Sequence, residues 1–107
     1  MNTIVNLTPH EINVVCVDGS VKIFKPSGKV ARVDSKSTLL RETDGIPYYR
    51  DTVGEVIDLP DEQADTLFLV SMVVRMALPT RIDLVSPGDL IRDDKGQPTG
   101  CKGLKIN

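Results

Sequence analysis

INVVCVDGSVKIFK, residues 12–25, contains the clearest strand signal in the chain. β-Branched residues are frequent in the stretch, and such residues favour strands. Between its halves, Asp18-Gly19 is a pair that tolerates the positive φ angles of a tight hairpin turn. We therefore predict a β-hairpin that pairs residues 12–17 with residues 20–25.

The segments on either side of this hairpin extend the strand pattern. Residues 3–7, TIVNL, are short and rich in β-branched residues, which predicts a strand before the hairpin. After the turn sequence PSG, Val30 and Val33 flank Arg32 and predict a strand over residues 29–33.

The middle of the chain has a weaker pattern. Residues 34–43, DSKSTLLRET, lack a helical period and are mostly polar, so we expect a surface loop that Leu39 and Leu40 anchor to the core. The next two apolar segments, 45–51 and 54–60, contain prolines that favour edge positions. They predict an irregular second hairpin.

The stretch TLFLVSMVVRMALP is compatible with two structures. Residues 66–70 suit a buried strand, and residues 72–78 suit a short helix that Ser71 can cap and Pro79 would end. The alternative is a single helix over residues 61–78, because periodicity separates buried strands from buried helices poorly. We favour the strand followed by the helix.

The C-terminal third predicts strands joined by tight turns, with RIDLVS and DLIRD on either side of Pro87-Gly88. A second turn, DDKGQPTG, precedes the last strand, CKGLKI. Together the segments predict an α+β fold, a single domain over residues 1–107 that is dominated by short antiparallel strands and has one short helix near 72–78.

Charge and cysteine content exclude several classes of protein. Thirteen basic residues nearly balance fifteen acidic ones, so nonspecific nucleic-acid binding is not expected.

The N-terminus resembles no signal peptide and no apolar run is long enough to cross a membrane, which predicts a cytoplasmic protein. Cys16 and Cys101 are then expected to be reduced thiols. With one histidine, no common Cys/His zinc set can form, and we expect no metal and no cofactor.

The single histidine, His10, lies in NLTPHEI, residues 6–12. Thr8, Pro9 and Glu11 have the spacing of a capping box with proline at the first helical position. This spacing explains the segment as a turn or helix start. As a functional alternative, His10 could act as a general base or ligand, although no catalytic motif surrounds it.

A second group of candidates could bind an anion. In KPSGK, residues 25–29, the side chains of Ser27 and Lys29 and the backbone at Gly28 could hold a phosphate, although no P-loop motif is present. Arginine suits carboxylate and phosphate. The further candidates are Ser71 and four arginines, Arg32, Arg75, Arg81 and Arg92, which could converge on an anion if the C-terminal strands lie beside the 29–33 strand. Ordinary ion pairing with the acidic residues of RIDL and LIRDD is the simpler interpretation of Arg81 and Arg92.

The order of several motifs resembles a family of small proteins that is widespread among tailed phages and prophages. The matching pieces are NLTPHEI (6–12), PSGKVARV (26–33), GIP and GEVIDLP (45–60), LVSMVV and RIDLVSPGDLIRD (69–93), and GC (100–101). The resemblance implies a phage accessory protein that acts in the bacterial cytoplasm, with no reaction attached. It implies that any site is drawn from Asn6, Thr8, Pro9, His10, Ser27, Gly28, Arg32, Ser71, Arg81, Asp83, Arg92 and Asp93.

Three functions are compatible with these observations. The first is a non-enzymatic binding protein that inhibits a host or defence protein or sequesters a small anionic, nucleotide-like ligand. Such a short chain would be expected to enclose a ligand as a homo-oligomer. The second is a small hydrolase or nucleotide-modifying enzyme that uses His10, and the third is a structural or assembly component of the virion. The absence of a catalytic constellation favours the first.

Overall fold

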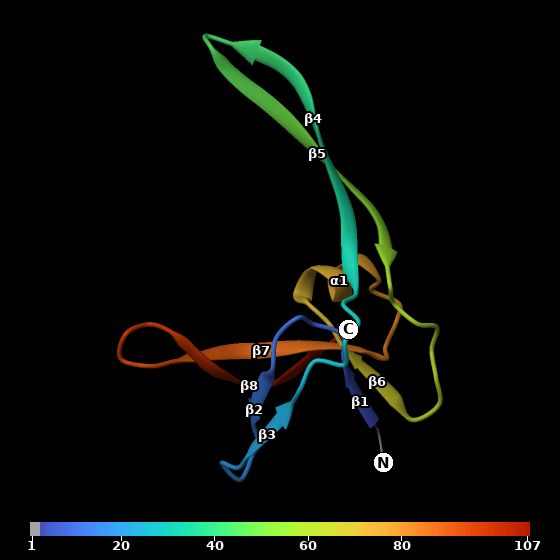
Figure 1. The fold of residues 1–107 in the computed structure, drawn as a ribbon, viewed down its shortest axis with the longest axis vertical. Helices are drawn as coiled ribbons and strands as arrows, with labels where there is room; N and C mark the ends of the chain where they lie inside the picture. The colour runs from blue at the N-terminus through green and yellow to red at the C-terminus, as the bar shows by residue number, and fades with distance from the viewer. Residues whose placement is uncertain (1–2) are drawn as a thin grey trace.

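The computed structural model describes residues 3–107, apart from the side chain of Val53. Over these residues the chain forms eight strands and one helix (Figure 1). The elements are β1 (Thr3–Asn6), β2 (Ile12–Val15), β3 (Val21–Phe24), β4 (Arg32–Thr43), β5 (Ile46–Ile57), β6 (Thr66–Leu69), α1 (Met72–Ala77), β7 (Leu84–Arg92) and β8 (Pro98–Ile106).

Six strands form one mixed sheet in the order β1-β6-β7-β8-β2-β3. The hairpin predicted from residues 12–25 is confirmed, because β2 and β3 pair antiparallel around the Asp18-Gly19 turn. By contrast, β1–β6, β6–β7 and β2–β8 pair in parallel. Parallel pairs need crossover connections. In β6–α1–β7 the helix makes that crossover, whereas β2 and β8 come from distant parts of the sequence.

The predicted α+β class is wrong, since α1 has only six residues and the fold is mostly β. Strands do dominate, as expected, but the expectation of short antiparallel strands misses the parallel pairs and the two twelve-residue strands. The central sheet is mixed, and it curls until its two edge strands, β1 and β3, approach each other. The backbone N–H of Ser27 donates to the carbonyl of Asn6 at 3.0 Å and nearly closes the sheet.

The longest strands, β4 and β5, project from this sheet as a two-stranded arm (Figure 1). They pair antiparallel along almost their whole length. Our prediction of a surface loop at residues 34–43 and of a separate hairpin within 45–60 is therefore wrong. Leu39 and Leu40 anchor nothing to the core, because both side chains are more than half exposed. The two-residue turn Asp44-Gly45, with both φ angles positive, joins the strands.

The β6–α1 segment confirms the prediction of a strand followed by a short helix and excludes one helix over residues 61–78. Ser71 has extended backbone angles, and its side-chain oxygen accepts from the N–H of Val74 at 3.3 Å. This bond satisfies one of the donors that a helix start leaves unpaired. The sequence signal at Ser71 therefore identified a true N-cap.

Strand β7 runs straight through Pro87-Gly88, where we had predicted a turn. β6 pairs with β7 only at Leu84 and Val85, so Pro87 lies beyond the last β6 partner, near an edge where proline is tolerated. Gly88 lies against β8 so closely that an added Cβ would overlap the carbonyl oxygen of Lys102. Close packing of two backbones, and not a turn, explains this glycine.

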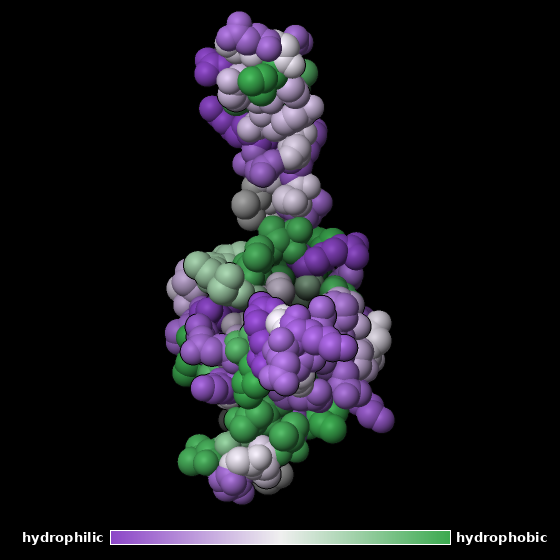
Figure 2. All heavy atoms as spheres, turned by 90° about the vertical axis from the view of Figure 1, so that its left-hand side faces the viewer, coloured by the Kyte–Doolittle hydropathy of each residue, from purple (hydrophilic) through white to green (hydrophobic). Residues whose placement is uncertain are grey.

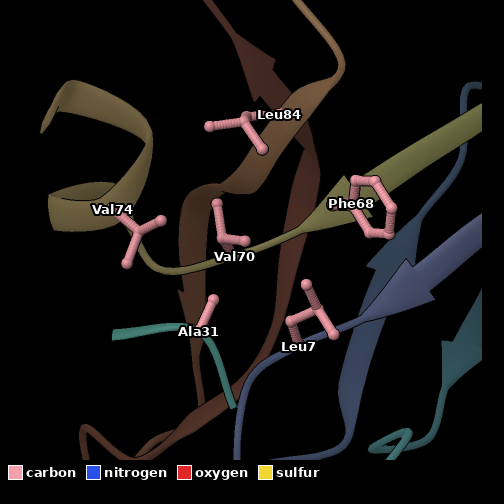
Figure 3. Close-up of a cluster of buried hydrophobic side chains, with 6 residues drawn as sticks. All are labelled: Leu7, Ala31, Phe68, Val70, Val74 and Leu84. Carbon is pink, nitrogen blue, oxygen red and sulfur yellow. The ribbon is translucent and has the colours of Figure 1, made fainter. Parts of the chain in front are cut away.

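The core lies where α1, β6 and β7 meet the segments that follow β1 and precede β4 (Figure 3). Its six buried side chains come from Leu7, Ala31, Phe68, Val70, Val74 and Leu84. Val33, Val56 and Leu59 pack against this cluster from the base of the arm and the segment that follows it. We call the six-stranded sheet together with α1 the body. The core contacts the arm only at the base of the arm, so this is where the arm is joined to the body.

Candidate functional site

Asn6 holds together the two segments that contain four of the predicted site residues. Its side-chain nitrogen donates at 2.9 Å both to the carbonyl of His10 and to that of Phe24. Its side-chain oxygen accepts from the N–H and the hydroxyl of Thr8, at 2.9 and 2.7 Å. Both residues are buried. Every polar atom of the Asn6 side chain is thus used to fasten residues 8–10 to the end of β3.

The segment around His10 is a turn and not a helix start, so the predicted capping box is wrong. The Thr8 hydroxyl bonds with Asn6 and with the carbonyl of His10 at 3.0 Å instead of capping a helix. Pro9, His10 and Glu11 are exposed. Within the described chain, we find no hydrogen bond from the His10 imidazole.

The segment 25–31 runs beside this turn. The Ser27 N–H donates to the Asn6 carbonyl, and the Ala31 N–H donates to the Leu7 carbonyl at 3.0 Å. Gly28 has a φ angle of 101°, a conformation that glycine adopts without strain. The predicted strand at 29–33 is wrong in its first half, because β4 begins only at Arg32.

The fold therefore brings together four of the predicted candidates, which lie on two adjacent turns that we call the turn cluster: His10, Ser27, Gly28 and Lys29. All four are exposed. Arg32 is exposed at the start of β4, three residues after the cluster. Among the described residues, no side-chain hydrogen bond or ion pair involves Ser27, Lys29 or Arg32, and none joins His10 to a nucleophile. The cluster has the donors of an anion site but not the geometry of a catalytic dyad.

The Arg81 side chain is bound by groups within the body. The Arg81 guanidinium donates to both carboxylate oxygens of Asp83, at 2.9 and 2.6 Å, and to the carbonyl of Pro60 at 3.1 Å. These hydrogen bonds lower the pKa of Asp83 and raise that of Arg81, against the opposing effect of burial. The ion pairing that RIDL suggested is confirmed, but the pair is largely buried, which leaves Arg81 little capacity for a ligand.

Arg75 and Ser71 belong to the scaffold of α1. Arg75 Nε donates to the buried hydroxyl of Ser86 at 2.8 Å. The Asn107 side chain donates to the carbonyls of Arg75, Leu78 and Arg81 at 3.0–3.2 Å, which closes the C-terminal end of the helix. No sequence signal identified Asn107, because a single asparagine after a strand matches no capping pattern.

Arg92 lies far along β7 and does not join the turn cluster. Its guanidinium donates to the carbonyl of Gly96 at 2.8 Å, within the β7–β8 turn. Asp93 accepts from the N–H groups of Lys95 and Gln97, both at 2.9 Å. These two motif residues shape a hairpin turn, as an Asx turn does.

The cavities near the body are small or open. One hollow, beside Asn13 and Cys101, has a volume of about 150 Å³, whereas ligand pockets measure about 300–1,000 Å³. Asn13 Oδ1 is buried there without a hydrogen-bond partner among the described residues. The hollow is thus too small to enclose a nucleotide in one chain.

Cysteine, metal and membrane features can be stated for residues 3–107. Cys16 and Cys101 are free thiols, as predicted. In this part of the chain, no group of three His, Cys, Asp or Glu side chains could hold a metal ion. Its one helix, α1, is too short to span a bilayer.

An apolar face on the β2–β3 hairpin is the clearest exposed surface of the body. Val15 pairs with Val21 and Asn13 with Ile23, so these side chains share one face of the hairpin. Val21 and Ile23 are more than half exposed, and Val17, two residues beyond Val15, is fully exposed. Figure 2 shows hydrophobic residues at this end of the body, opposite the arm. Sequence reasoning identified the hairpin but not its exposed face.

Comparison with known protein families, with curated proteins and with solved structures finds no match for this chain. The resemblance to the phage family therefore remains a prediction based on the motifs quoted above. In the structure, seven of those twelve motif residues have internal roles: Asn6 and Thr8 in the first turn, Ser71 at the helix start, Arg81 with Asp83, and Arg92 and Asp93 in the β7–β8 turn.

Proposed function

We propose that the protein is a phage-encoded, non-enzymatic binding protein that acts in the bacterial cytoplasm by binding and inhibiting a host or defence protein. The exposed apolar face of the β2–β3 hairpin supports this proposal most directly. Contiguous exposed apolar side chains are typical of protein-binding surfaces. No described residue pair forms a nucleophile and base, which favours binding over catalysis.

The β2–β3 face has the composition of a small interface centre. Val21 and Ile23 form its apolar middle, and the adjoining turn contributes exposed Val17 and Asp18. Such an arrangement gives an apolar contact with a charged residue at its rim. Val14, on the opposite face of β2, is buried in the body, so the hairpin presents these side chains from a fixed support.

The test is a plating assay on bacterial hosts that carry single defence systems. A host that expresses the wild-type protein should recover phage plating for at least one system. The Val21→Glu/Ile23→Glu double variant should lose this effect, because charges on the apolar face would be desolvated on binding. Its melting temperature should stay close to that of the wild type.

Ile82→Glu is the matched control, since Ile82 is 73% exposed and lies outside the β2–β3 hairpin. This variant should retain the effect on plating. Equal activity of the double variant and the control would overturn the assignment to the β2–β3 face. Failure of the wild-type protein against every system would overturn the inhibitor proposal.

A second candidate function is the binding of a small anionic, nucleotide-like ligand at the turn cluster. It is supported by the fixed position of the two turns around Asn6 and by the unpaired donors of His10, Ser27 and Lys29. Backbone N–H groups in such turns and a neighbouring ammonium group bind phosphate. Because no enclosed cavity covers the described part of the cluster, this site would need a second chain to shield the ligand.

Thermal shift with nucleotides and cyclic dinucleotides tests the second candidate. A ligand that binds the folded state alone stabilises it by RT ln(1 + [L]/Kd), about 2.7 kcal/mol at a hundredfold excess over Kd. We expect the stabilisation to disappear in Lys29→Ala/Arg32→Ala and to persist in Lys95→Ala, a control at the distant β7–β8 turn. No stabilisation of the wild-type protein by any of these compounds at millimolar concentration would exclude this function.

A further inference from the structure

The arm gives the chain far more surface than a monomer of its mass normally has. The accessible surface is 7753 Å², whereas a compact monomer of 11.7 kDa exposes about 5,900 Å². The radius of gyration is 16.9 Å, compared with about 13 Å for a compact domain of this length. The excess of about 1,900 Å² is within the range that one subunit buries in an obligate dimer.

The part of the arm near its turn, which we call the tip, exposes apolar side chains on both faces. Leu39 pairs with Tyr49 on one face, whereas Tyr48 pairs with Arg41 and Ile46 with Thr43 on the other. These apolar residues of the tip are between 42% and 61% exposed. A two-stranded sheet without a packed face is marginally stable in water. The tip therefore has the composition of a contact surface without its partner.

The edges of the arm are poorly suited to receive another strand. Each strand contains one bulge, since the pairing shifts between Val33 and Ser35 and again between Leu39 and Arg41. Bulges twist an edge away from regular pairing. A partner should thus contact the faces of the arm and not extend its hydrogen-bond ladder.

A complementary apolar surface lies at the base of the same arm. The α1 residues Met72, Val73 and Met76 are each more than half exposed, and α1 packs beside β4. A groove of about 530 Å³ adjoins it, with Val56, Leu59 and Leu78 among its lining residues. In Figure 2 hydrophobic residues lie at the point where the arm meets the body.

Between the tip and the base the arm is polar. Pairs such as Lys36 with Thr52 and Ser37 with Asp51 occupy its middle. Along the arm the order is therefore apolar, polar, apolar. Two such arms placed antiparallel would match apolar with apolar at both ends, and a two-fold axis would pass through the polar middle.

We infer that the occupant of these surfaces is a second copy of this chain, and that two arms pack antiparallel with each tip on the other copy's α1 and arm base. The arm is long enough, because twelve residues of strand span about 40 Å. In this symmetric dimer the two tip-to-base contacts are equal, and the apolar residues of both the tip and the base of each arm are covered. It leaves the β2–β3 face, at the opposite end of the body, free for the partner proposed above.

Sedimentation velocity tests the assembly. We expect the wild-type chain to sediment at twice its 11.7 kDa mass at micromolar concentration. Leu39→Glu/Tyr49→Glu should sediment as a folded monomer, whereas the control Ile82→Glu, which alters an exposed apolar residue away from the tip, should stay dimeric. A monomeric wild-type protein, or a dimer that both variants retain, would overturn the inference.

Disulfide cross-linking tests the arrangement without relying on a disruptive variant. In a Cys16→Ser background, one chain carries Leu39→Cys and a second, distinguishable by size, carries Met76→Cys. Mild oxidation of the mixture should give mainly the mixed disulfide, and replacing Met76→Cys by Ile82→Cys should abolish it. Mainly tip-to-tip disulfides of Leu39→Cys chains, or no cross-link in a dimer, would overturn the antiparallel arrangement.

Discussion

The body and the arm are both built from β-strands, yet they are stabilised in different ways. Body strands such as β1, β2 and β6 have only four residues, but each has a neighbour in the sheet or a side chain in the core. The arm strands have twelve residues each and the longest ladder in the molecule, yet both faces are exposed over the tip. Burial of apolar side chains, more than the number of ladder bonds, therefore determines which region is stable by itself.

The largest difference between the two regions should come from removing an aromatic ring in each. Phe68 is 2% exposed and lies in the core, whereas Tyr49 is 61% exposed on the arm. We expect Phe68→Ala to lower the free energy of unfolding by about 3–5 kcal/mol. Tyr49→Ala should change the free energy of unfolding of the dissociated, monomeric chain by about 0.5 kcal/mol or less. Urea unfolding of both variants in dilute solution measures this, and equal losses would contradict the comparison.

The next largest effect concerns side-chain hydrogen bonds. Asn6→Ala leaves the carbonyls of His10 and Phe24 and the Thr8 donors without their partner, so we expect a loss of about 2–4 kcal/mol. The matched change in the arm is Ser37→Ala, which removes the exposed bond to Asp51. It should cost about 0.5 kcal/mol or less. Thermal unfolding of the two variants provides the measurement.

The Arg81–Asp83 pair should make the stability of the body depend on pH. Its hydrogen bonds lower the folded pKa of Asp83 below the usual value of 3.8. The pair therefore contributes fully above pH 3.8, and its contribution is lost as the pH falls through the lower folded pKa. We expect Asp83→Asn to cost about 1.5–3 kcal/mol at neutral pH.

Urea unfolding of wild type and Asp83→Asn from neutral to strongly acidic pH measures this effect. The difference between the two proteins should shrink as the pH falls below 3.8. Asp18→Asn is the matched control in an exposed turn, where hydrogen bonds with Ser20 also lower the carboxylate pKa. Its effect on stability should be smaller at every pH, because water screens exposed charges. A constant difference across the pH range would show that Asp83 acts through packing instead of charge.

The smallest expected difference in stability between the body and the arm comes from replacing one glycine in each. An added Cβ would overlap a carbonyl oxygen at both positions, that of Lys102 for Gly88 in β7 and that of Asp34 for Gly54 in β5. Gly88→Ala should cost about 1–3 kcal/mol, because the β7–β8 ladder must shift inside the body. Gly54→Ala should cost less, because the arm can open locally. Hydrogen exchange would show faster exchange confined to the arm, and loss of protection throughout the body would contradict this expectation.

Local sequence signals correctly predicted the parts of the fold where one or two residues determine the backbone conformation. Asp18-Gly19 identified the β2–β3 turn, and Ser71 identified the start of α1. The arm was missed because apolar alternation arises from one buried face, and neither face of its outer half is buried. Yet Asp44-Gly45 is the same residue pair as Asp18-Gly19 and connects β4 to β5. That pair was the available signal.

The candidate site was predicted only in part, for a different physical reason. The sequence contains the donors of the turn cluster, but their proximity depends on Asn6, whose side chain joins residues far apart in the sequence. The arginines were expected to converge as one alternative. Arg81 and Arg92 instead bond with groups close to them in the sequence, whereas Arg75 bonds with Asn107, which is far away in the sequence. A partner that is distant in the sequence leaves no local sequence pattern.

The position of β8 has a consequence for how the chain folds during synthesis. β8 follows the other described strands in the sequence, but it lies between β7 and β2 and connects the β2–β3 hairpin to the rest of the sheet. Until it has left the ribosome, the hairpin and its apolar side chains have no strand to join. Folding of the six-stranded sheet therefore waits for β8, and until then the hairpin is the segment that chaperones should protect.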